Sequence, residues 1–348
     1  MRPLLQHNAS KLLGLAAALL LLAAACAASI ALGTTSIRLT TTVEALVAYN
    51  PANTEHVIIV TTRVPRAVFA LTVGASLAMA GAMMQALTRN PLASPGLFGI
   101  NSGAVLAVVL ALLLLPLTSL SQLVWAAFVG AAGAALLVYG LASLGGGNLT
   151  PIRLVLAGSA LSALFSALTQ GVLVLDESGL QNVLFWLAGS VAGKELGTLY
   201  QVLPYMVIGG GAALLLGYPL TILSSGEEMA KGLGQRIGLV KAIAAAAVVM
   251  LAGSAVAAAG AIGFVGLVMP HFARYLAGTD YRWVIPYSAV LGAILLLGAD
   301  IVARFPVQPG ELPLGVVTGL IGVPFFIYIA RSDFNRRRAQ DETNRSVS

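Results

Sequence analysis

Long apolar runs recur along this chain, and their length constrains the fold more than any other feature. The runs approach about 20 residues, the length of helix that spans the hydrocarbon core of a bilayer. Hydrophobic residues make up 58% of the 348 positions and charged residues only 9%. A soluble domain cannot bury so much apolar surface. The sequence therefore predicts an all-α, polytopic membrane protein whose surroundings are the lipid bilayer.

The runs and the breaks between them predict about ten transmembrane helices in a single domain covering residues 1–348. The first run has a basic flank, as a signal peptide does, but it is longer than a typical signal h-region and is interpreted as a membrane helix. The single Cys26 excludes an intramolecular disulfide. Asn182–Gly193 is too short to span and is predicted to be an interfacial or re-entrant helix. The expected spans are Leu12–Leu32, Arg63–Leu87, Ala104–Leu115, Leu120–Leu144, Ile152–Leu175, Leu199–Leu223, Leu239–Ala261, Ile262–Ala277, Val284–Ala303 and Pro313–Ala330.

The basic residues support one orientation of these helices. Cytoplasmic loops carry an excess of Lys and Arg. With both termini in the cytoplasm, 14 of the 19 basic residues lie on the inner side, including a basic tail at residues 331–348. The net charge of +6 therefore reflects membrane orientation, and no nucleic-acid partner is expected. The outer basic residues are Arg38, Arg63, Arg66, Lys194 and Arg304.

One charged segment, Ser224–Leu239 (SSGEEMAKGLGQRIGL), separates two apolar runs on the cytoplasmic side. Glu227 and Lys231 are four positions apart with the acid first, which supports a short exposed helix. Glycines punctuate the segment and indicate tight turns. A solvated connection would need no helix, so we interpret residues 224–238 as a docking surface for a cytoplasmic partner.

Three of the outer arginines, Arg63, Arg66 and Arg304, stand at the ends of membrane helices. Asp300 precedes Arg304 by four positions, which predicts an ion pair within one helix. Arg63 and Arg66 have no acid at helical spacing, so their side chains either extend to the lipid headgroups or bind a partner. The polar, Thr-rich segment Gly33–Thr62 before them is predicted to be an external loop.

Within the second span, small residues recur every four positions at Gly74, Ala78 and Ala82, a stripe that lets neighbouring helices approach closely. The nearby Met79, Met83 and Met84 either fill the packing or line a translocation path, and packing is the favoured interpretation.

Several kinds of chemistry are missing from the sequence. It has no phosphate-binding Walker loop, no paired cysteines and no histidine cluster. His271 is interpreted as a structural residue. A secondary transporter would need ionisable residues near the membrane centre, and a passive channel would leave the charged cytoplasmic segment unexplained. A membrane enzyme and a proton-coupled transporter remain as alternatives to a pore subunit powered by a partner.

Three blocks resemble the family of ABC-importer permeases that take up ferric siderophores, haem and cobalamin. The first runs from Arg63 to Ala104 and the second is the charged segment Ser224–Leu239. The third covers Gly260–Phe326, with GFVGLVMPHFAR, ADIVAR and ELPLGVVTGLIGVPFF. Ala261 stands where this family usually has proline. Within the family, GINSGA and Leu175–Leu196 are most similar to the ferric-siderophore branch.

The resemblance implies a permease that makes no bonds itself and needs no cofactor, since ATP and magnesium would bind to separate subunits. Its expected partners are a second, identical or different permease, two ATP-binding subunits and an extracytoplasmic substrate-binding protein. The resemblance places Arg63, Arg66 and Arg304 in docking to the binding protein. It also implies a bacterial cytoplasmic-membrane location and a ferric siderophore as cargo, with haem or cobalamin as the alternative. The residues expected to couple to the ATPase are Gly226, Glu227, Glu228, Ala230, Leu233 and Gly234.

Overall fold

The computed structural model describes residues 3–115, 119–144, 151–175, 188–307, 310–325 and 327, and within these ranges the chain is helical with no β-strand. Seven of the described helices are long and apolar enough to cross a membrane. The coarser prediction of an all-α, multi-span protein is confirmed, while the count of ten spans stays a prediction.

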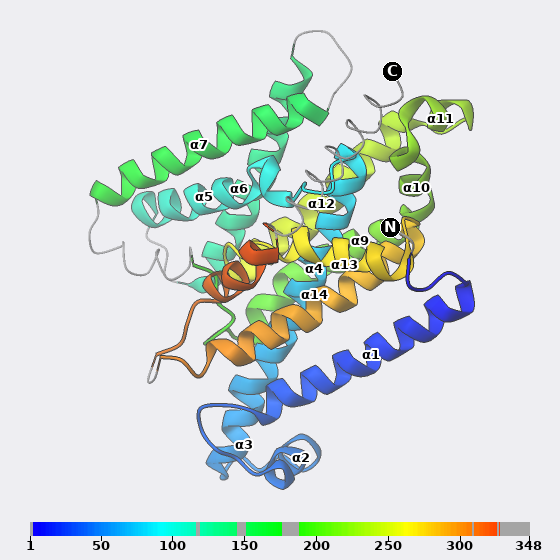
Figure 1. The fold of residues 1–348 in the computed structure, drawn as a ribbon. Helices are drawn as coiled ribbons and strands as arrows, with labels where there is room; N and C mark the ends of the chain where they lie inside the picture. Colours follow the sequence, from blue (N-terminus) through cyan, green and yellow to red (C-terminus); the bar gives the residue numbers. More distant parts are fainter. Residues whose placement is uncertain are drawn as a thin grey trace.

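Figure 1 shows the elements, which are α1 (Asn8–Ala31), α2 (Leu39–Val47), α3 (Thr54–Ile58), η1 (Ile59–Arg63), α4 (Val64–Thr88), η2 (Pro95–Phe98), α5 (Ile100–Leu114), α6 (Leu120–Ser143), α7 (Pro151–Leu175), α9 (Leu196–Leu215), α10 (Gly217–Ser225), α11 (Glu227–Gly232), α12 (Ile237–Ala259), α13 (Val265–Ala277) and α14 (Tyr281–Ala303), followed by an apolar helix at Leu314–Phe325.

Two helix boundaries differ from the sequence-based expectation. The predicted span Leu199–Leu223 is divided into α9 and α10, which meet at Leu216. The predicted loop Gly33–Thr62 contains the helices α2 and α3 and most of η1, and α3, η1 and α4 form one helical span from Thr54 to Thr88. Asn53 begins α3, because its side chain accepts a hydrogen bond from the backbone N–H of Glu55 at 2.9 Å. Residues 182–187 of the expected interfacial segment and the tail 331–348 lie outside the described residues.

Helix α4 is the central element of the bundle and packs against α12, α13 and α14. Its small residues explain the close packing. A Cβ atom added at Gly81 would lie 1.8 Å from the backbone oxygen of Gly266 in α13, and one at Gly74 would lie 2.4 Å from that of Gly292 in α14. Only glycine lets the backbones meet at these two crossings. The predicted small-residue stripe is therefore a contact surface.

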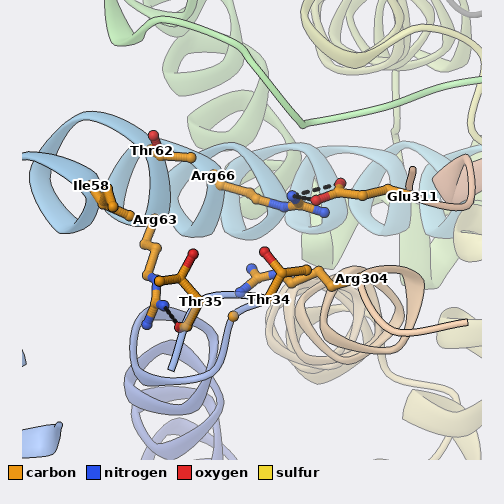
Figure 2. A pocket seen from close by; sticks show the side chains of 9 residues that line it. Thr34, Thr35, Ile58, Thr62, Arg63, Arg66, Arg304 and Glu311 are labelled. Atoms are coloured by element: carbon orange, nitrogen blue, oxygen red, sulfur yellow. Dashed lines mark hydrogen bonds and ion pairs between the residues drawn. The ribbon is translucent and has the colours of Figure 1, made fainter. Parts of the chain in front are cut away.

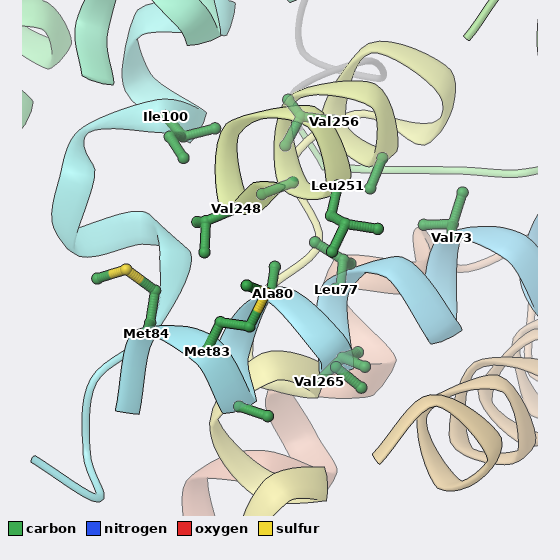
Figure 3. Packing of buried hydrophobic residues seen from close by; sticks show 14 of the residues in the cluster. Val73, Leu77, Ala80, Met83, Met84, Ile100, Val248, Leu251, Val256 and Val265 are labelled. Carbon is green, nitrogen blue, oxygen red and sulfur yellow. The ribbon is translucent and has the colours of Figure 1, made fainter. Parts of the chain in front are cut away.

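The core beside this stripe is apolar and closely packed (Figure 3). Met83 and Met84 are 0% and 1% exposed and lie near Val248 and Ile100. A flexible thioether side chain fills irregular gaps between helices. Packing is thus the role that this structure gives to these two methionines.

Helix α13 confirms that the eighth apolar segment is short. Its 13 residues extend about 20 Å, less than the hydrocarbon core of about 30 Å. The preceding residues are not helical, and Phe264 adopts a left-handed backbone conformation with φ 66°. The Phe264 ring packs on Gly322, where an added Cβ would lie 2.3 Å from the ring. Non-helical backbone at membrane depth must be buried in protein or line a cavity, and here the neighbouring helix covers it.

The helices give the molecule two ends. The ends of α1 and α14 and the start of α4 meet at one of them, called the α2 end. The end of α4 and the start of α12 meet at the other, called the α11 end (Figure 1).

Candidate functional site

The three arginines singled out in the sequence come together at the α2 end. Arg63 is the last residue of η1, Arg66 lies in the first turn of α4, and Arg304 follows the last residue of α14. Asp300 in α14 and Glu311 after it complete the group, which is called the arginine cluster. A cavity of about 70 Å³ lies beside it, lined also by Gly33, Thr34, Thr35, Ile58 and Thr62 (Figure 2).

A buried carboxylate holds two of these arginines together. Arg66 Nε donates a hydrogen bond to Asp300 Oδ1 at 2.7 Å, and Arg304 Nη2 donates to Asp300 Oδ2. Arg66 Nη1 also pairs with the Glu311 carboxylate at 2.7 Å. Asp300 is 0% exposed, so its charge is balanced by the two guanidinium groups alone. The predicted pair between Asp300 and Arg304 is confirmed. Arg66 does have acidic partners, but they come from elsewhere in the chain.

Arg63 and Arg304 also donate hydrogen bonds to backbone carbonyl oxygens at the end of α1, while Arg304 Nε is buried with no hydrogen-bond partner among the described residues. Arg63 Nη1 donates to the carbonyl oxygens of Ala31 at 2.6 Å and Ile30 at 3.1 Å. Arg304 Nη1 donates to the carbonyl oxygen of Ser29 at 2.7 Å and to that of Leu32. The last carbonyls of a helix have no partner within it, and cations there are stabilising. Arg63 and Arg304 thus close the end of α1.

These contacts leave little charge at the surface. Arg63, Arg66 and Arg304 are 4%, 8% and 2% exposed. Docking of these three arginines to a binding protein stays a prediction; in this conformation their guanidinium groups join α1, α4 and α14. Sequence reasoning missed this because it considered acids only at helical spacing. The available signal was Asp300 itself, since a carboxylate within an apolar helix requires a partner.

The α11 end carries the charged segment predicted to dock a partner. Helix α11 begins after Gly226, whose φ is 138°, and ends before a turn at Gly234, whose φ is 76°. Both values favour glycine. Ala230 is 0% exposed and packs inward. The short helix predicted within residues 224–238 is thus present.

Glu227 attaches α11 to the rest of the molecule. Its Oε1 atom lies 2.8 Å from Lys241 Nζ in α12 and 3.6 Å from Arg89 Nη2, just beyond α4. The hydrogen bond from Lys241, with the nearby charges of Lys241 and Arg89, lowers the pKa of Glu227 below its ordinary value of 4.5. Sequence spacing had suggested Lys231 as the partner, but Lys241 and Arg89 make the contacts.

The opposite side of α11 is available for contact. Met229 and Leu233 are 58% and 65% exposed, and Glu228, Lys231 and Gly234 are exposed beside them. An apolar pair surrounded by polar residues has the composition of a protein contact. Of the six residues expected to couple to an ATPase, Glu228, Leu233 and Gly234 lie on this surface. Gly226 and Glu227 are half-buried, and Ala230 is in the core.

Among the described residues, no group of three or more His, Cys, Asp or Glu side chains is placed to hold a metal ion.

Comparison with known proteins shows which protein family this chain resembles. The sequence matches the FecCD transport family over residues 20–332. It is 53% identical to the probable siderophore transport system permease protein YfiZ of Bacillus subtilis (strain 168), covering 87% of this chain and 91% of YfiZ. It is 42% identical to the Fe(3+)-citrate import system permease protein YfmD of the same organism, covering 95% and 98%. A solved structure of a metal-chelate type ABC transporter in an inward-facing conformation superposes with a TM-score of 0.80 at 30% identity, covering 91% and 98%.

Proposed function

The chain belongs to the FecCD transport family and is a permease subunit of an ABC importer, and from this premise we propose that its cargo is a ferric siderophore. It is not an enzyme, because ATP hydrolysis belongs to a separate subunit. The observation that carries the cargo proposal is the similarity, over most of both chains, to permeases named for siderophore and iron-citrate transport. Haem or cobalamin is the alternative within the family.

Uptake of radioactive iron by a strain lacking this gene tests the cargo. Ferric hydroxamate, catecholate and citrate complexes are supplied separately, with haem and cobalamin as controls. We expect the gene to restore uptake of at least one ferric siderophore and to leave cobalamin uptake unchanged. Restoration of cobalamin or haem uptake alone would overturn the proposal. Uptake that stops with a proton uncoupler while ATP persists would instead support a secondary transporter.

We propose further that the α11 end faces the cytoplasm and contacts an ATP-binding subunit. Two features support this: the exposed apolar pair Met229 and Leu233, and the excess of basic residues predicted on that side. Both termini are then cytoplasmic. ATP binding in the partner moves α11, and Glu227 passes the movement to α12 and to the end of α4. Two permeases and two ATP-binding subunits complete the proposed assembly, in a bacterial cytoplasmic membrane.

Docking of a substrate-binding protein at the α2 end is also proposed, through Arg63, Arg66 and Arg304. Burial of these arginines adds a condition to that proposal. A carboxylate from a partner must replace an internal one, and Glu311 is the most accessible, with 27% of its side chain exposed. Glu311 thus occupies, on Arg66, the place that an acid of the binding protein takes. Asp300, at 0% exposure, stays in place.

A further inference from the structure

Helix α2 has three different sides. Leu39, Val43, Leu46 and Val47 are 69%, 60%, 54% and 83% exposed. Their spacing of four, seven and eight positions from Leu39 puts them on one side of a helix. Thr42 and Ala45, at 6% and 1% exposed, form the side that packs on the protein. Thr40 and Glu44 are exposed on a third, polar side.

Helix α2 contacts a helix whose own apolar residues are mostly exposed. Helix α1 is a candidate membrane span with only 6% of its apolar window buried, and its exposed leucines extend to Leu32 at 48%. Helix α2 starts seven residues later. In Figure 1, α1 is seen along its length, and α2 is seen nearly end-on near the C-terminal end of α1, at the edge of the molecule. Helix α2 therefore crosses the direction of α1 instead of extending it.

The connection between these helices is held firmly. Arg63 donates hydrogen bonds to the carbonyl oxygens of Ala31 and Thr35, and Arg304 donates to that of Leu32. An added Cβ at Gly33 would lie 2.7 Å from the Arg63 guanidinium, so the arginine covers the turn closely. These contacts hold the start of the connection against α4 and α14, and α2 itself contacts α3 and η1. The apolar side of α2 is thus held at a defined place at the α2 end.

We propose that α2 is an interfacial helix that lies in the lipid leaflet at the α2 end, an inference that rests on the proposed placement of the bundle in a membrane. Leu39, Val43, Leu46 and Val47 enter the boundary between headgroups and acyl chains, and the side with Thr40 and Glu44 faces water. A short helix with an apolar side beside a polar side binds membranes in this position. The exposed Arg38 and Tyr49 flank it, as basic and aromatic residues do at headgroup level.

The lipid surface is the occupant that these observations support, because seven residues join α2 to α1, a candidate membrane span whose own apolar residues are mostly exposed. A binding protein would approach from the water side, where α2 presents Thr40 and Glu44. The arginine cluster then keeps the leaflet boundary at a constant height relative to the start of α4. That height sets where a partner meets the α2 end.

Nitroxide spin labels measure the depth of α2 in the intact transporter complex in nanodiscs. In a Cys26→Ala background, a label at Val43→Cys reports the apolar side, and one at Glu44→Cys, the adjacent position, is the matched control. We expect the Val43 label to be several-fold more accessible to oxygen, relative to a water-soluble nickel chelate, than the Glu44 label. Val47→Cys is a second position on the same side if the first variant does not assemble. Iron uptake by each variant shows that the transporter still functions, so failure here leaves the proposed function standing.

Three results overturn the inference. Equal or greater access of the nickel chelate at Val43 would place α2 in water. Low access to both reagents with dipolar broadening between labels would indicate contact between two copies of this chain. Low access to both without broadening would indicate that another protein covers α2.

Discussion

Arg66 Nε donates a hydrogen bond to Asp300 Oδ1 at 2.7 Å, although the two residues are 234 positions apart in the chain. The bond joins the first turn of α4 to the last turn of α14. The same two helices cross at Gly74 and Gly292, where their backbones nearly touch. The crossing brings the helices together, and the ion pair sets their rotation and register.

Replacing Asp300 with Asn should strongly destabilise the permease. The change leaves the guanidinium groups of Arg66 and Arg304 buried with one fewer acid, and breaking a buried pair costs about 3–5 kcal/mol. The midpoint of thermal unfolding in detergent measures the effect. Glu311→Gln is the control, because that carboxylate is 27% exposed and its removal should shift the midpoint less. Equal shifts of the two midpoints would mean that the burial of Asp300 does not determine how much its carboxylate stabilises the permease.

Glu311→Gln also tests docking at the α2 end. Removing the internal carboxylate should free Arg66 for an acid of the binding protein and speed association in nanodiscs, with a stronger dependence on salt. Arg66→Glu should slow association. If both variants associate at the wild-type rate at low and high salt, Arg66 has a structural role only.

Gly81→Ala should prevent normal packing of α4 on α13. The new Cβ would lie 1.8 Å from the Gly266 oxygen, and a backbone atom cannot move aside as a flexible side chain does. We expect a large loss of folded protein in the membrane fraction, measured by fluorescence-detected size exclusion. Gly140→Ala in α6 is the matched control, since nothing lies within 4 Å of its added Cβ. Alanine there should be neutral or stabilising, by about 1 kcal/mol at most.

Leu233→Asp should weaken binding to the ATP-binding subunit without unfolding the permease. Leu233 is 65% exposed on α11, so its loss removes apolar contact only in the assembly. Co-purification of the two subunits and the stimulated ATPase rate measure the effect. Val307→Asp, a similarly exposed apolar residue at the opposite end, is the control and should change neither. Full assembly of the Leu233 variant would show that α11 is not the docking surface.

Attachment of α11 should be insensitive to pH near neutrality and lost in acid. Because Lys241 and Arg89 lower the pKa of Glu227, its contribution is complete above the ordinary value of 4.5 and disappears as pH falls through the lowered pKa. Hydrogen exchange of residues 227–233, corrected for the intrinsic rate at each pH, should therefore be constant between about pH 5 and 8.

In the Glu227→Gln variant, the backbone amides of residues 227–233 should exchange faster than in wild type across the neutral pH range. The difference should vanish in acid. Glu228→Gln removes an exposed carboxylate from the same turn and should leave exchange unchanged. A wild-type profile that changes near pH 7 would contradict the assignment.

The amino-acid sequence by itself determined the class of fold and the place of the short charged helix α11. Apolar runs of membrane length predicted the spanning helices, and α11 formed within the charged, glycine-bounded stretch 224–238. The pair Asp300–Arg304 was also predictable, because its partners are one helical turn apart. These are local properties, which the chain specifies through neighbouring residues.

Only the tertiary structure decided which charges meet. Arg66 pairs with Asp300 and Glu311, and Glu227 with Lys241 and Arg89, between segments that the sequence does not place beside each other. Arg63 donates its hydrogen bonds to backbone carbonyl oxygens, and no pattern of side chains in the sequence reveals such contacts. A helix pattern predicts which residues share a face, but not which neighbour that face meets. That choice depends on the rotation and register of whole helices. The glycine crossings of α4 bring the helices together, and the ion pair between Arg66 and Asp300 sets their rotation and register.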